Sequence, residues 1–146
     1  MRLARSRLAL WARILLPPYL IVVGFIVFSP ADDTSQATGP LAWVFDRLDE
    51  LETSFEPGYV ALEFVANIAM FVPLGALVRL AFGRIPWWGV LALGFATTVT
   101  IELVQSTMPS RFSTVSDVIA NTLGTAVGLL LVRAAASRVG NQSLSE

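Results

Sequence analysis

The stretch Val115-Ser-Asp-Val-Ile-Ala-Asn-Thr-Leu-Gly-Thr-Ala-Val-Gly-Leu-Leu-Leu-Val-Arg133 is apolar over most of its length. A transmembrane helix needs about 20 such residues, so this segment predicts a helix that crosses a membrane. Its polar exceptions, Asp117 and Asn121, fall on one helix face together with Gly124 and Gly128. The two glycines form a GxxxG pattern, which allows helix backbones to approach closely in a membrane. We therefore expect this face to pack against neighbouring helices and not against lipid.

The rest of the chain has the same apolar character. Its 146 residues are 55% hydrophobic and only 14% charged, and the mean hydropathy of +0.67 lies far above that of a soluble domain. Three further segments approach membrane-spanning length, at about Leu8–Phe28, Tyr59–Phe82 and Trp87–Gln105. We predict a single all-α domain over residues 1–146, a small polytopic membrane protein with four transmembrane helices in a bundle.

Charge is strongly segregated along the chain. Eight of the ten basic residues precede or open the first apolar segment, lie between the second and third, or follow the fourth. The loop at residues 29–58 carries seven acids against Arg47 alone. By the positive-inside rule, the arginine-rich side is cytoplasmic, which places both termini there and the acidic loop outside.

Two segments allow more than one interpretation. Residues 41–55 carry apolar side chains on one helical stripe, which predicts a short extracytoplasmic amphipathic helix on the membrane surface or against the bundle. The alternative is a cover over a site. The first apolar segment could instead be a signal peptide ending at Ser29-Pro30-Ala31, but its apolar run is long and Pro30 is awkward beside a cleavage site.

Polar pairs also interrupt the second and third segments. They are Glu63 with Asn67 and Glu102 with Gln105, each pair on one helix face. The alternating direction of the segments places both pairs in the outer half of the membrane, at the depth of Asp117 and Asn121. An acid at the bilayer centre costs roughly 2.5–3.5 kcal/mol on insertion scales, so such groups are expected to gather inside the bundle. We predict one outer-leaflet site.

The chemistry of that site is bounded by what the chain lacks. The absence of cysteine and histidine excludes disulfides, Cys/His zinc sites, thiol nucleophiles and a histidine base, and no haem or nucleotide motif is present. Arg111, in the short outer loop, is suited to bidentate binding of a phosphate or carboxylate. The candidate catalytic residues are Glu63, Glu102 and Asp117, and the candidate substrate-binding residues are Arg111, Asn67, Gln105 and Asn121. No metal site is assigned, although the acids leave a Mg²⁺ or Ca²⁺ cofactor open.

A structural interpretation of the same residues competes with this one. Thr114-Val-Ser-Asp117 resembles a capping box at the start of the fourth segment, with Asp117 at the third helical position. The amides of Asn67, Gln105 and Asn121 could serve only as interhelical hydrogen-bonding groups. Such bonding does not require three acids, which favours a functional site.

At these residues the chain resembles the VanZ-like family of bacterial membrane proteins. The resemblance lies in Asn67-Ile-Ala-Met-Phe-Val-Pro-Leu-Gly75, Glu102-Leu-Val-Gln105 and Arg111-Phe-Ser-Thr-Val-Ser-Asp-Val-Ile-Ala-Asn-Thr-Leu-Gly124. Many members carry a second acid three residues after the arginine, where this chain has Thr114. The resemblance implies a multi-pass protein of the bacterial plasma membrane, linked to resistance to the glycopeptide teicoplanin.

Three functions are weighed on these grounds. The first is a site that binds or acts on a membrane lipid or lipid-linked envelope precursor with an anionic head group. The second is a non-enzymatic membrane module whose polar network holds the fold and supports a membrane partner or a second copy. The third, a small transporter, is disfavoured because the polar groups do not continue to the inner side. Nothing in the sequence indicates a nucleic-acid partner.

Overall fold

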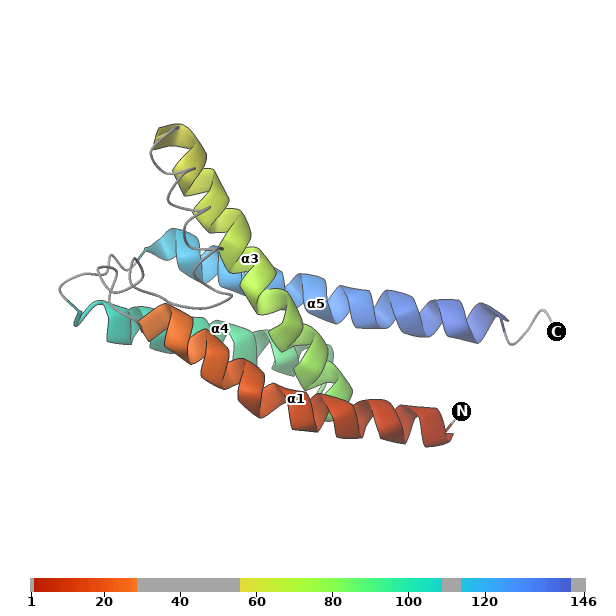
Figure 1. Cartoon of the computed structure of the whole chain (residues 1–146). Coiled ribbons are helices and arrows are strands. Elements are labelled where there is room, and N and C mark those ends of the chain that lie inside the picture. Colours follow the sequence, from red (N-terminus) through yellow and green to blue (C-terminus); the bar gives the residue numbers. More distant parts are fainter. Residues whose placement is uncertain (1, 29–55, 109–113, 143–146) are drawn as a thin grey trace, which may run out of the picture.

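The computed structural model describes residues 2–28, 56–108 and 114–142. They form four helices, α1 (Arg2–Phe28), α3 (Glu56–Ala81), α4 (Trp87–Gln105) and α5 (Val115–Gln142), and the described residues contain no strand (Figure 1). Each helix includes a segment long and apolar enough to cross a membrane: Ser6–Phe28, Ala61–Ala81, Trp87–Gln105 and Val115–Arg138. The predicted all-α, four-span architecture is therefore confirmed. The predicted amphipathic helix at 41–55 lies outside the described residues.

Three helix boundaries differ from the sequence expectation. α1 begins at Arg2, before the apolar segment that starts at about Leu8. α3 begins at Glu56, within the loop predicted for residues 29–58. Pro57 is compatible with this early start, because the first turn of a helix needs no N–H donor from that residue. α5 continues to Gln142, beyond the apolar segment that ends at Arg133. Alanines follow Arg133 in the sequence, and alanine is the strongest helix former.

The closest helix packing joins α3 to α5, which cross obliquely (Figure 1). A Cβ atom at Gly124 would overlap the backbone carbonyl oxygen of Ile68, and one at Gly128 would overlap that of Val72. Gly75 lies equally close to the α5 backbone from the α3 side. The GxxxG pattern therefore marks a real close approach of two backbones, as the sequence predicted.

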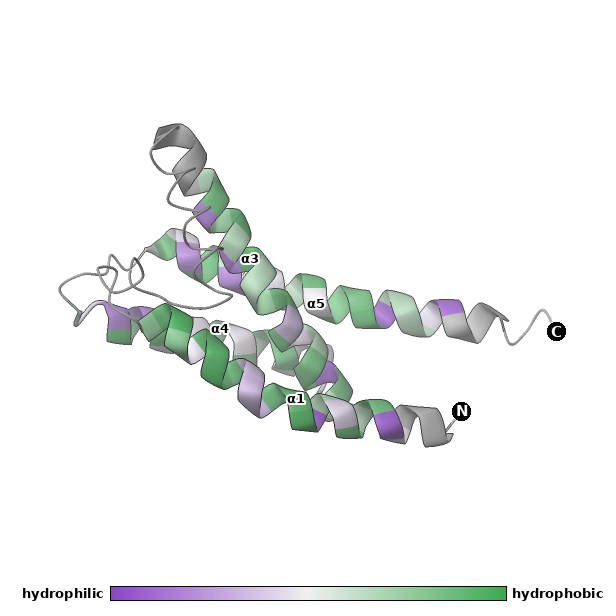
Figure 2. Cartoon of the chain, in the orientation of Figure 1, coloured by the Kyte–Doolittle hydropathy of each residue, from purple (hydrophilic) through white to green (hydrophobic). Residues whose placement is uncertain are grey.

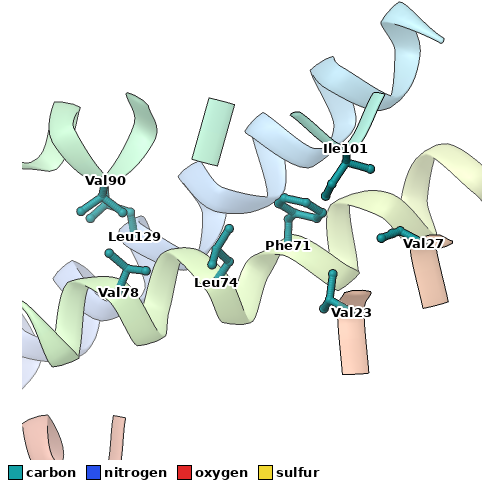
Figure 3. Close-up of a cluster of buried hydrophobic side chains, with 8 residues drawn as sticks. All are labelled: Val23, Val27, Phe71, Leu74, Val78, Val90, Ile101 and Leu129. Atoms are coloured by element: carbon teal, nitrogen blue, oxygen red, sulfur yellow. The ribbon is translucent and has the colours of Figure 1, made fainter. Parts of the chain in front are cut away.

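The apolar core lies where all four helices meet, as shown in Figure 3. Phe71 of α3 is only 1% exposed, and its neighbours in the cluster come from α1, α4 and α5. The cluster comprises Val23, Val27, Phe71, Leu74, Val78, Val90, Ile101 and Leu129. Many other large apolar side chains are exposed. Hydrophobic residues predominate along the middle of the helices (Figure 2). In a membrane these side chains contact lipid, so their exposure is expected.

One end of the bundle is defined by contacts between α1 and the turn that follows α3. Arg13 Nε donates a 3.0 Å hydrogen bond to the carbonyl of Ala81, and its guanidinium lies 5.9 Å from the ring centroid of Phe82. Arg79 donates to the carbonyls of Gly83 and Ile85, which fixes the turn into α4. The C-terminal part of α5 extends toward the same side (Figure 1). We name this the proximal end and the opposite one the distal end.

Candidate functional site

A hydrogen-bonded group of side chains lies at the distal end, where α5 begins. Thr114 precedes α5, and its hydroxyl accepts a 3.2 Å bond from the backbone N–H of Asp117 and donates a 2.8 Å bond to Asp117 Oδ2. Asn67 of α3 donates a 2.7 Å bond from Nδ2 to Asp117 Oδ1. Both oxygens of the Asp117 carboxylate are thus held, one from the start of its own helix and one from a different helix.

Glu102 joins this group from α4. Its side chain is buried, with 7% exposure, and Oε2 accepts a 3.0 Å bond from the backbone N–H of Thr114. In a capping box, the acid at the third helical position usually accepts that bond. Here Asp117 occupies the position, but Glu102 of another helix accepts the bond. We name Asn67, Glu102, Thr114 and Asp117 the acid cluster, which links α3, α4 and the start of α5.

The other predicted amides have different partners. Gln105 is 9% exposed, and its Nε2 donates a 2.8 Å bond to the carbonyl of Val27 in α1. Asn121, one turn deeper than Asp117 on α5, is 2% exposed and donates a 2.9 Å bond to Thr98 Oγ1 of α4. Its Oδ1 is buried and has no hydrogen-bond partner among the described residues. Gln105 therefore faces α1, and Asn121 lies one helical turn nearer the proximal end than the acid cluster.

The two remaining predicted site residues are Glu63 and Arg111. Glu63 lies on α3 one turn before Asn67, on the same face, and its side chain is exposed. Arg111 lies outside the described residues. Within the part of the chain that the structure describes, no three acidic side chains gather as a metal-ligand set. Glu102 and Asp117 are instead linked through Thr114.

Two threonines have larger roles than the sequence indicated. Thr98 is fully buried and accepts the hydrogen bond of Asn121. Its position one turn before Glu102 was the available signal, since residues four apart share a face. Thr114 contributes a hydroxyl and an N–H to the two acids of the cluster.

Comparison with protein-family models gives a match over residues 16–136, to the family described as VanZ/LLP1. The chain belongs to the VanZ/LLP1 family. The match includes every candidate site residue and confirms the resemblance seen in the sequence. Together with the four apolar helices, membership makes this a multi-pass membrane protein, of a family linked to the cell envelope and to glycopeptide resistance. No curated protein and no solved structure matched the chain.

Proposed function

We propose that this VanZ/LLP1 protein binds the anionic head group of an envelope lipid or lipid-linked precursor at the outer leaflet of the bacterial plasma membrane. The observation that carries the proposal is the acid cluster, in which Glu102 and Asp117 from two helices are linked at the distal end. The arginine segregation supports an orientation with both termini in the cytoplasm and the distal end outside.

The acids themselves argue for more than a structural network. A glutamine at position 102 could accept the same hydrogen bond from the Thr114 N–H through its amide oxygen. It would do so without the cost of a carboxylate in or near hydrocarbon. The same holds for an asparagine at 117, which could accept from Asn67. Ionisable groups at membrane depth are most often functional, and these two can act on a ligand as a base or as oxygen ligands of Mg²⁺ or Ca²⁺.

Arg111 supplies the positive charge in this proposal. It precedes Thr114 by three residues, and a fully extended chain of that length spans about 10 Å. Its guanidinium is suited to hold a phosphate or carboxylate by two parallel hydrogen bonds. Glu63 and Asn67 would flank the head group from α3. The unpartnered Oδ1 of Asn121 offers a buried acceptor to a donor on the ligand.

A non-enzymatic module is the second candidate, and two contacts favour it. The Asn67–Asp117 and Asn121–Thr98 bonds join different helices, as a purely structural network would. In that case the protein would support a membrane partner, and the cluster would hold the bundle together.

Lipid retention separates the two candidates. The purified protein in nanodiscs would be offered phosphatidylglycerol or phosphatidylcholine, and retained lipid would be counted by native mass spectrometry. We expect preferential retention of phosphatidylglycerol, reduced about tenfold by Arg111→Lys because lysine lacks the planar fork. Arg84→Lys, an exposed arginine in the α3–α4 turn, is the matched control and should retain lipid normally.

The abundance of the Glu102→Gln variant in the membrane distinguishes the proposal from the structural module. Under the proposal, Glu102→Gln keeps normal membrane abundance while lipid preference and teicoplanin susceptibility change. A protein without head-group preference, whose Glu102→Gln variant first loses abundance, would contradict the proposal and support the structural module.

A further inference from the structure

A groove of about 390 Å³ lies between α1 and α4, within the volume range of small-molecule sites. Residues of α1 and α4 line it, among them Leu20, Gly24, Val27, Thr97, Thr100 and Ile101. On both helices these residues belong to the half nearer the distal end. The family match does not indicate which molecule occupies this groove.

The groove is lined mainly by hydrocarbon, although two threonines contribute to it. Thr97 Oγ1 donates a 2.8 Å bond to the carbonyl of Leu93, and Thr100 Oγ1 donates a 2.8 Å bond to that of Ala96. Their hydroxyls are thus bonded within their own helix, and none of the described residues that line the groove is charged. A polar occupant would lose its hydration without gaining partners, whereas an alkyl chain loses nothing.

The groove leads to the polar residues at the distal end. Thr97, Ile101 and Gln105 are four residues apart and form one stripe on α4. Gln105 donates its amide to the carbonyl of Val27, which itself lines the groove, so this bond lies at the distal end of the groove. Glu102 is the next residue after Ile101 and turns to the acid cluster. The groove and the acid cluster thus lie on adjoining faces of α4, toward the same end of the bundle.

We propose that this groove holds an acyl chain of the lipid whose head group binds at the acid cluster. This inference rests on the proposed function and names its ligand class: an anionic lipid with at least one hydrocarbon tail. Gly24 provides space for the tail, because no atom lies within 4 Å of where its Cβ would stand. A larger side chain at Gly24 enters the groove instead of colliding with a neighbouring helix.

Photo-crosslinking tests the proposal. Phosphatidylglycerol and phosphatidylcholine that carry a diazirine in the acyl chain would be added to the protein in nanodiscs, and adducts mapped by mass spectrometry. We expect the phosphatidylglycerol adducts to concentrate on residues 20–28 and 96–101. The hollow of about 570 Å³ between α1 and α3, lined by residues that include Leu15 and Leu77, is the internal reference for unselective lipid contact.

Variants that fill the groove complete the test. Gly24→Leu should abolish the concentration of adducts, and Thr97→Leu should do the same from the α4 side if the first variant fails to fold. Gly83→Leu is the matched control, since Gly83 also has no neighbour within 4 Å but lies in the α3–α4 turn. It should leave the adduct pattern unchanged.

The outcomes distinguish failure of the groove from failure of the proposed function. Equal labelling of the groove by both lipids would show a groove that takes any acyl chain, and would overturn both the anionic ligand class and the head-group preference. Retained phosphatidylglycerol preference with adducts spread evenly over the helices overturns the tail site alone. Because the chain has no cysteine, Gly24→Cys provides a further check. A disulfide-linked dimer of that variant in membranes would show a second copy at the groove and overturn the acyl-chain proposal.

Discussion

Asn67 and Asp117 are 50 residues apart in the sequence, yet a 2.7 Å hydrogen bond between their side chains joins α3 to α5. Short side chains can meet across these helices because glycines at the same interface bring the two backbones close together. The bond is part of the acid cluster and lies toward the distal end of this glycine-containing interface.

A double-mutant cycle should detect coupling between these two residues. We expect Asn67→Ala and Asp117→Ala together to cost less stability than the sum of the single changes, by about 0.6–1.7 kcal/mol, the range of interhelical hydrogen bonds in membranes. The free energy of unfolding in bicelles is the measurement. Additive single effects would show that the bond contributes nothing to stability.

Alanine should have opposite effects on stability at a glycine inside the α3–α5 interface and at a glycine outside it. Gly128→Ala places a methyl group against the carbonyl of Val72, so the helices must separate, at a cost of about 1–3 kcal/mol. Gly24→Ala meets no atom within 4 Å and should be neutral or gain about 0.5–1 kcal/mol, since alanine is the better helix former. Thermal unfolding in detergent compares the two. Equal effects would contradict the close approach at Gly128.

Thr98 should contribute to stability through its hydroxyl. Thr98→Val leaves the Nδ2 of buried Asn121 without its acceptor, and we expect a loss of about 1 kcal/mol. Thr100→Val is the control, because that exposed hydroxyl bonds only to a carbonyl of its own helix. The two variants would be compared by unfolding in the same detergent. A larger loss for Thr100→Val would argue against the Thr98–Asn121 contact.

The orientation can be tested by labelling, because the chain contains no cysteine. We expect Glu50→Cys to react with a membrane-impermeant thiol reagent on intact cells. Arg84→Cys and Ser137→Cys should react only after the membrane is permeabilised, since the arginine segregation predicts that both positions are cytoplasmic. The reverse pattern would invert the topology and move the acid cluster to the inner leaflet.

Much of the fold could be predicted from the sequence because the signals are local. Apolar length determines which segments can span a membrane, and the helical period shows which residues share a face. The GxxxG pattern at Gly124 and Gly128 correctly predicted a packing face. The role of Thr114 as the residue that caps α5 was also readable from its spacing to Asp117.

Only the tertiary structure decided which partner each polar side chain has. Membrane depth placed Glu102 and Gln105 at one level, but three residues along a helix turn the side chain by about 60° around the axis. Glu102 consequently bonds to Thr114 at the start of α5, whereas Gln105 bonds to Val27 of α1. The sequence by itself determined the four helices and their polar faces, because these depend on spacing within one helix. The partners depend on how each helix is rotated and crossed against its neighbours, which follows from the packing of all four.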